Sequence, residues 1–183
     1  FLNAIETGRL YNLEYKNKGI KAPFCLKTKF EFYDKTVFTL LKKVLGIERG
    51  RLFPVAGAPL SDTVNEFLQS VNIPIVYGYG LSETTATVCF YPEIGFQFGS
   101  IGETMPGVEV KIDESNGEIL VKGKTVTTGY YNKPEENARS FTADGFFRTG
   151  DAGRLEGNVL FFTERIKDLY KTSNGKYIAP QAI

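Results

Sequence analysis

The first half of the chain alternates apolar residues at helical spacing with short apolar runs that end in glycine. Apolar positions recur at helical spacing over 37–45, so we predict an amphipathic helix that Asp34 caps and Gly46 ends. The run 51–56 predicts a strand, and the apolar face that follows Ser61 predicts a second helix with Ser61 as its cap. This order is strand, tight turn, helix.

A second segment repeats that order. Residues 73–77 have the composition of a buried strand, residues 78–81 form a glycine-rich turn, and Ser82 is expected to open a helix. Two such segments side by side predict a parallel sheet with covering helices.

After Pro92 the pattern changes to short alternating segments separated by glycines. The segments 108–112 and 118–121 predict strands of an antiparallel sheet. Asn116 and Gly117 lie between them and predict a hairpin with a type I′ turn, because this pair tolerates the positive φ angles of that turn.

The last third of the chain carries two further signals. Pro134 is suited to the first position of a short helix that runs to Phe141, because the missing N–H of proline costs little there. Gly157 and Asn158 predict a turn into a strand over 159–162.

These patterns predict an α/β plus β fold. We expect the end of a parallel α/β lobe, then a small antiparallel β barrel or sandwich, then the start of a C-terminal domain. The expected limits are 1–92, 93–164 and 165–183. The abrupt start at Phe1 and the apolar run near Ile183 also lead us to expect an internal piece of a longer protein.

Composition narrows the possible chemistry. The chain has 183 residues, 42% of them hydrophobic, and 22 basic residues against 21 acidic ones give a net charge of +1. No global field therefore favours nucleic acid, and we expect no nucleic-acid partner. The absence of histidine and the wide spacing of the two cysteines exclude Cys/His zinc sites and a histidine base. Without a signal-like segment or membrane span, we expect a cytoplasmic protein.

The segment YGYGLSETT, residues 77–85, is the most specific feature. A glycine turn after a buried strand lies where α/β proteins bind ligands, and Tyr79, Ser82 and Glu83 offer an aromatic face, a hydroxyl and a carboxylate. A nucleotide monophosphate needs such groups for its base, its phosphate and Mg²⁺. The competing interpretation is a glycine turn followed by a capped helix, with Tyr79 in the core.

Four other segments stand in a recognisable order around this one. They are AGAPLS (56–61), GEILVKGKTVTTGYYNKPE (117–135), FRTGD (147–151) and TERIKDLYKTSNGKYIAP (163–180). Together the five resemble the acyl-adenylate-forming (AMP-binding) superfamily, and their wording is most similar to bacterial long-chain fatty acyl-CoA synthetases. The resemblance covers the chain from about Val37 onward.

The resemblance implies a nucleotide site. The residues that would contact the nucleotide are Gly57, Ala58, Pro59, Tyr77, Gly78, Tyr79, Gly80, Ser82, Asp151 and Arg165. Tyr79 would stack on adenine, Ser82 would bond the α-phosphate, and Glu83 would bind Mg²⁺. Relatives more often have threonine in place of Ser82, which keeps the hydroxyl. Many have an amide side chain in place of Tyr77, which puts its contact in question.

The resemblance also assigns roles further along the chain. Asp151 would accept hydrogen bonds from the ribose hydroxyls, and Arg165 would contact ribose and phosphate. Lys167 would be the hinge of the C-terminal domain. Ser82, Glu83 and Lys171 would be the catalytic residues, with Lys171 acting in the second half-reaction. The competing interpretation is a turn aspartate and ordinary surface charges.

The implied reaction has two steps. A fatty acid and ATP give acyl-AMP and pyrophosphate, and then coenzyme A takes the acyl group and releases AMP. Two parts of the family pattern match nothing in this sequence: the Ser/Thr/Gly-rich loop with its lysine and the catalytic C-terminal lysine. We therefore expect a fragment that is inactive alone.

Alternatives within and outside this chemistry stay open. The chain could belong to an adenylation domain or an aryl-CoA ligase, or to a non-catalytic relative that only binds nucleotide. Peripheral membrane association of the full-length enzyme is a further expectation. Acyl chain length and oligomeric state do not follow from the sequence.

Overall fold

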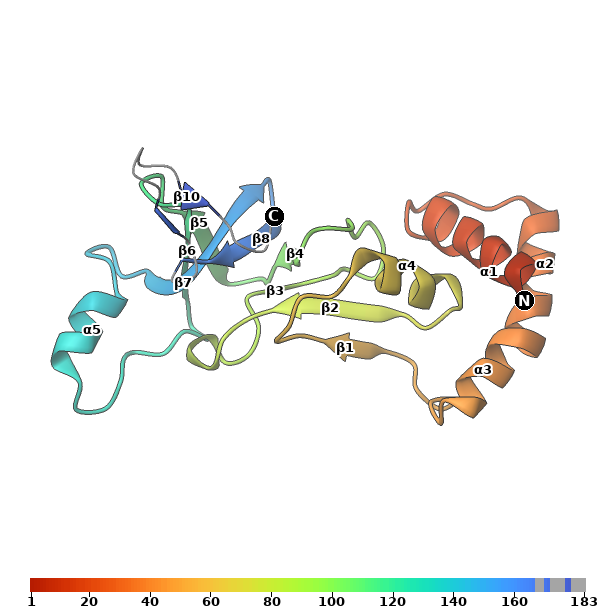
Figure 1. Ribbon diagram of the computed structural model, residues 1–183, viewed down its shortest axis with the longest axis horizontal. Helices are drawn as coiled ribbons and strands as arrows, with labels where there is room; N and C mark the ends of the chain where they lie inside the picture. The colour runs from red at the N-terminus through yellow and green to blue at the C-terminus, as the bar shows by residue number, and fades with distance from the viewer. Residues whose placement is uncertain (167–169, 172–176, 179–183) are drawn as a thin grey trace. The chain divides into compact units, whose positions relative to one another are not determined.

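The computed structural model describes residues 1–166, 170–171 and 177–178 and divides into two compact units (Figure 1). The first, here the helical unit, comprises Phe1–Gly78 and Tyr91–Gly99. The second, here the β unit, comprises Tyr79–Phe90 and Ser100–Ile183.

The helical unit is built mainly of helices around a short parallel strand pair. Its elements are α1 (Leu2–Arg9), η1 (Leu10–Lys16), α2 (Phe24–Tyr33), η2 (Asp34–Phe38), α3 (Thr39–Val44), β1 (Phe53–Val55), α4 (Asp62–Ser70) and most of β2 (Ile75–Tyr79). Helix α1 packs against α4 (Figure 1). Phe38 is fully buried in the core beside Phe30, Val71 and Ile73.

The predicted cap at Asp34 is wrong. The elements α2, η2 and α3 form one uninterrupted helical run, and Asp34 has helical angles within it, φ −62° and ψ −45°. Its carboxylate accepts a hydrogen bond from the Asn72 side chain at 2.8 Å. The helix begins ten residues earlier, at Phe24, because apolar positions such as Phe30 extend the packed face upstream.

The parallel strand pair was predicted correctly. Strands β1 and β2 pair in parallel, with Phe53 opposite Ile75 and Val55 opposite Tyr77. Ser61 occupies the N-cap position of α4 with an extended backbone, but its side chain makes no capping hydrogen bond.

The helix predicted after Ser82 is wrong. Only a single 3₁₀ turn, η3 (Ser82–Thr84), forms, with the Thr84 hydroxyl accepting a hydrogen bond from Leu81 N at 2.9 Å. Thr85 and Ala86 then adopt φ of 53° and 75°. Left-handed angles at two consecutive residues with a Cβ end the right-handed turn.

The β unit is an antiparallel sheet with strand order β3, β4, β8, β7, β6, β5. The strands are β3 (Cys89–Phe90), β4 (Gly102–Thr104), β5 (Val108–Ile112), β6 (Glu118–Gly123), β7 (Phe147–Glu156) and β8 (Val159–Arg165). A separate antiparallel pair joins β9 (Tyr170–Lys171) and β10 (Tyr177–Ile178). Val88, Ile119, Val121 and Leu160 are fully buried in the β unit. Parallel strands in one unit and antiparallel strands in the other confirm the predicted α/β plus β class.

The predicted hairpin between β5 and β6 exists, but its turn is not type I′. Asp113 N donates to Glu118 O, and only Gly117, at φ 75°, has a positive φ in the loop. Asn116 instead accepts a hydrogen bond from Glu118 N through its side chain at 3.0 Å. A type I′ turn needs positive φ at both central residues, so the longer loop has replaced it.

The remaining local predictions hold. Helix α5 (Pro134–Ser140) begins with proline at its first turn, and Gly157, at φ 60°, turns the chain into β8. Within the described residues, no helix combines the length and apolar character that crossing a membrane requires.

Candidate functional site

The first group of predicted nucleotide contacts lies in the helical unit. Gly57, Ala58 and Pro59 form an exposed loop after β1. The Tyr77 hydroxyl donates a hydrogen bond to Ala58 O at 3.2 Å and accepts one from Leu60 N at 3.3 Å. The end of β2 therefore holds this loop in place.

The second group lies in the β unit and centres on Tyr79 and Asp151. Asp151 is 4% exposed, and its Oδ2 accepts a hydrogen bond from the Tyr79 hydroxyl at 2.7 Å. The ring of Tyr79 also lies near Phe162, with centroids 6.4 Å apart. Two residues that the sequence separates by 72 positions are thus in direct contact.

Arg165 completes this group. Its Nε lies 3.5 Å from Asp151 Oδ1, and the two residues are opposite one another on β8 and β7. Burial raises the pKa of the Asp151 carboxyl, whereas the Tyr79 hydrogen bond and the Arg165 charge lower it. Burial, together with the bond to Asp151, raises the pKa of the Tyr79 hydroxyl. A buried acceptor thus lies beside an exposed cation, since the Arg165 side chain is 68% exposed.

Glu83 is held by a tyrosine for which the sequence suggested no role. Its Oε1 accepts a hydrogen bond from the Tyr130 hydroxyl at 2.8 Å, and its backbone carbonyl accepts one from Thr127 N at 2.7 Å. Burial and the adjacent Glu83 carboxylate raise the pKa of Tyr130 to about 12. Tyr130 lies in the recognised segment 117–135, but only the structure shows what it contacts.

Replacing Tyr130 by phenylalanine should lower the free energy of unfolding of the chain by about 1 kcal/mol, because it removes this one hydrogen bond. Because the folded pKa of Tyr130 is raised above the usual 10.0, the stabilisation is complete below pH 10 and is lost as the pH rises through about 12. Urea denaturation at pH 7 measures the loss. Because the chain has 10 tyrosines, the titration of Tyr130 is followed as the difference in phenol absorbance between the unmodified chain and the Tyr130→Phe variant.

Tyr131 offers a matched control for that substitution. It is the next residue and is 90% exposed, so Tyr131→Phe should leave the free energy of unfolding unchanged. Equal stability of the Tyr130→Phe and Tyr131→Phe variants would show that the bond to Glu83 contributes nothing.

The glycine turn that follows Tyr79 depends on close backbone contact at Gly80. A Cβ on Gly80 would lie 1.9 Å from Ala86 O, so any larger residue would push the two segments apart. Ser82 follows at the start of η3 with an exposed side chain. Its hydroxyl is therefore accessible to a ligand.

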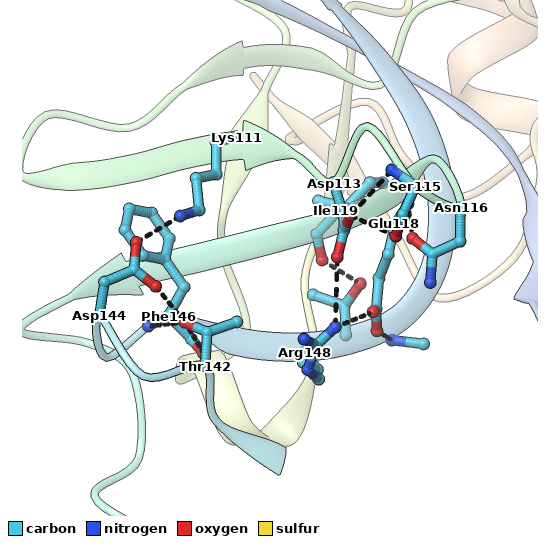
Figure 2. Close-up of polar contacts among 12 residues, drawn as sticks. Lys111, Asp113, Ser115, Asn116, Glu118, Ile119, Thr142, Asp144, Phe146 and Arg148 are labelled. Atoms are coloured by element: carbon cyan, nitrogen blue, oxygen red, sulfur yellow. Dashed lines mark hydrogen bonds and ion pairs between the residues drawn. The ribbon is translucent and has the colours of Figure 1, made fainter. Parts of the chain in front are cut away.

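A buried glutamate was also missed. Glu118 is 6% exposed, and its Oε1 accepts a hydrogen bond from Gly150 N, next to Asp151, at 2.9 Å (Figure 2). Its Oε2 accepts one from Arg148 Nη1, also at 2.9 Å. A glutamate at the start of an otherwise apolar strand, with an arginine in FRTGD, was the available signal.

Two predicted residues lie at the C-terminal end. Lys167, the expected hinge, lies outside the described residues. Lys171 belongs to β9, where its backbone is opposite Tyr177. Among the described residues, no cluster of three or more His, Cys, Asp or Glu side chains could hold a metal ion by itself.

Comparison with known proteins shows which family and which relatives the chain resembles. The family described as "AMP-binding enzyme" matches residues 15–131. Long-chain-fatty-acid–CoA ligase 2 of Schizosaccharomyces pombe is 36% identical over 82% of this chain and 24% of its own length. The ligase FadD15 of Mycobacterium bovis is 34% identical over 86% of this chain and 26% of its own. The chain thus spans about a quarter of the length of these curated relatives.

The fold is also similar to those of solved coenzyme A synthetase structures and of MatB. The o-succinylbenzoate coenzyme A synthetase of Bacillus subtilis, in complex with AMP, superposes with a TM-score of 0.67 at 27% identity, over 79% of this chain and 33% of that one. The apo MatB of Rhodopseudomonas palustris superposes with a TM-score of 0.65 at 29% identity, over 84% and 32%.

Proposed function

Because the chain belongs to the AMP-binding enzyme family, we propose that it is part of an ATP-dependent long-chain fatty acid–CoA ligase. The carboxylate of the fatty acid attacks the α-phosphorus of ATP, forming acyl-AMP and releasing pyrophosphate. The thiol of coenzyme A then attacks the acyl carbonyl, forming the thioester and releasing AMP. The similarity to named long-chain ligases supports this substrate class.

One observation carries the nucleotide part of this proposal: Tyr79, Asp151 and Arg165 form one contact group. A buried carboxylate with two oxygens suits a pair of vicinal ribose hydroxyls. An exposed arginine beside it suits the neighbouring phosphate. In this proposal the half-buried ring of Tyr79 stacks on the base, while its hydroxyl holds the carboxylate.

Glu83 fits the magnesium ion that the family implies. Its Oε1 is held by Tyr130, and among the described residues no hydrogen bond or ion pair reaches its Oε2. Mg²⁺ in nucleotide sites is typically bound by one or two carboxylates together with phosphate oxygens and water. The ion, when bound, offsets the charge that gathers on the phosphates. Tyr130 keeps the carboxylate oriented for that role.

The remaining residues act by position and charge. Ser82 donates its exposed hydroxyl to the α-phosphate, and the loop of Gly57, Ala58 and Pro59 lies along the adenine with little side-chain bulk. Lys171 contributes to thioester formation. No residue of the chain forms a covalent intermediate, so catalysis rests on positioning and electrostatics.

Replacing Asp151 by alanine in the complete ligase should weaken ATP and AMP binding together by about 1–3 kcal/mol, roughly fivefold to 150-fold in Kd. The substitution leaves the ribose hydroxyls without a charged acceptor. Calorimetric titration with AMP measures the effect directly.

Asp144 provides the control, because its carboxylate is 57% exposed and its side-chain partners, Lys111 and Thr142, are not among the proposed nucleotide contacts. Asp144→Ala should leave AMP affinity unchanged. Unchanged AMP affinity in Asp151→Ala as well would remove the ribose assignment.

Substrate class is tested on the complete ligase with ATP and Mg²⁺. Fatty acids of increasing length should drive pyrophosphate exchange and acyl-CoA formation, whereas aromatic acids and amino acids should not. The alternative of an aryl-CoA ligase or an adenylation domain has one observation in its favour, the structural similarity to an o-succinylbenzoate ligase. Exchange driven by aromatic acids alone would establish it. A ligand-binding relative without catalysis would bind AMP and support no exchange.

Cytoplasmic localisation and peripheral membrane association of the complete enzyme stay predictions from the sequence.

A further inference from the structure

Strand β7 contains an irregularity at Asp151 and the two residues before it. Glu118 is opposite Ala152 and Leu120 is opposite Arg148, so β6 has only Ile119 between these pairs. Strand β7 has three residues there, 149–151. The extra residues form a bulge, which bends a strand and redirects its side chains.

A bulge takes backbone N–H groups out of the regular ladder, and two of the three N–H groups in this segment find side-chain acceptors. Gly150 N donates to Glu118 Oε1 at 2.9 Å, and Asp151 N donates to the Thr149 hydroxyl at 3.1 Å. The same hydroxyl donates to Ile119 O at 2.7 Å, which ties the bulge to β6. Gly150 adopts φ 73°, an angle that favours glycine.

The Glu118 carboxylate is buried, so its charge needs full compensation. Gly150 N satisfies one oxygen, and Arg148 Nη1 satisfies the other at 2.9 Å (Figure 2). Arg148 reaches outward to Asp113 Oδ2 at 3.4 Å. The Glu118 hydrogen bond is the main cause of the raised pKa of Arg148.

We propose that Glu118 is a positioning residue for nucleotide binding: it holds the bulge that directs the Asp151 carboxylate toward Tyr79 and Arg165. This inference rests on the proposed role of Asp151 at the ribose. Without Glu118, Gly150 N has no buried acceptor, and the segment 149–151 loses the hydrogen bond that fixes its conformation. Asp151 would then leave the position in which Tyr79 bonds to it at 2.7 Å.

The test compares AMP with 2′,3′-dideoxy-AMP, which lacks the ribose hydroxyls, in the complete ligase. Glu118→Ala should weaken AMP binding about tenfold, and dideoxy-AMP binding by less than about twofold. A general loss of structure would weaken both nucleotides alike. In an Asp151→Ala background, Glu118→Ala should weaken AMP binding little further, because both substitutions remove the same contact between Asp151 and the ribose.

Two further variants keep the test sharp. Glu118→Gln retains the side-chain shape but offers an oxygen to only one of the two donors, Gly150 N and Arg148 Nη1. It should therefore weaken AMP binding more than dideoxy-AMP binding, but by less than Glu118→Ala does. If Glu118→Ala fails to fold, Glu118→Gln provides the test. Asp113→Asn is the control. It alters the outer contact of Arg148 and the bonds from Ser115 but leaves the Glu118–Gly150 bond in place, so it should change AMP binding by less than about twofold.

Amide hydrogen exchange supplies a readout that does not depend on the ligand. In both Glu118 variants, exchange at Gly150 should accelerate while exchange in β5 stays unchanged. If Asp151→Ala fails to alter the preference for AMP over dideoxy-AMP, the ribose assignment is wrong, and exchange alone judges the bulge. If Asp151→Ala removes that preference and the Glu118 variants keep it, the positioning role is wrong.

Discussion

The 183-residue chain by itself should release no pyrophosphate from ATP and palmitate above the level of its Glu83→Gln variant. Two cationic parts of the family pattern match nothing in this sequence, the lysine of the phosphate loop and the catalytic C-terminal lysine. Stabilisation of transition-state charge is usually the largest catalytic term, and removing one such group typically costs about a hundredfold to a thousandfold. Removing two should put the rate below detection.

The comparison within that experiment is the complete ligase, which should release pyrophosphate when a fatty acid is added. Weak binding of AMP to the isolated chain is compatible with the expectation, because Tyr79 and Asp151 are both in place. Pyrophosphate release by the isolated chain well above the Glu83→Gln level would show that the missing cations are dispensable.

Lys167→Pro in the complete ligase should slow thioester formation by orders of magnitude and spare adenylation. The resemblance places the hinge of the C-terminal domain at this residue, and the described part of β8 ends shortly before it, at Arg165. A hinge residue adopts two combinations of φ and ψ, whereas proline permits only a φ of about −65°. One of the two half-reactions is therefore lost. We expect adenylation to survive, because the family resemblance implies that the resting conformation is the one that performs adenylation.

The assay follows pyrophosphate exchange and, separately, acyl transfer from preformed acyl-AMP to coenzyme A. Lys167→Ala is the matched control, since it removes the side chain and leaves the backbone free to rotate. It should spare both half-reactions. Equal losses of both steps in Lys167→Pro would assign the residue to an ordinary surface loop.

Local sequence signals predicted most elements of the fold. They failed where contacts with residues remote in sequence determine the local conformation. The parallel pair of β1 and β2, the hairpin of β5 and β6, and α5 follow from apolar spacing and from turn and cap residues. The helix expected after Ser82 fails because Thr85 bonds to Thr125 O, 40 residues away, from a left-handed conformation. No local pattern contains that contact.

The site divides in the same way. Asp151 and Glu83 are recognisable from their motifs, but their partners are remote in sequence: Tyr79 lies 72 residues from Asp151, and Tyr130 lies 47 residues from Glu83. The bulge before Asp151 is also invisible in the sequence, because it results from the register in which β6 and β7 pair. Motifs therefore predicted candidate groups for the site, and pairing between strands decides where they lie.

The chain passes between the two units after Gly78, after Phe90 and after Gly99. Each unit is therefore assembled from two separate stretches, and the segment 79–90 is tethered at both ends to the helical unit. Joining stretches that are distant along a flexible chain costs loop-closure entropy. Once the core of one unit has formed, the ends of the two stretches that make up the other unit are already held near one another. Formation of either core thus lowers the entropic barrier to completing the other, and the two cores are coupled during folding through their shared backbone alone.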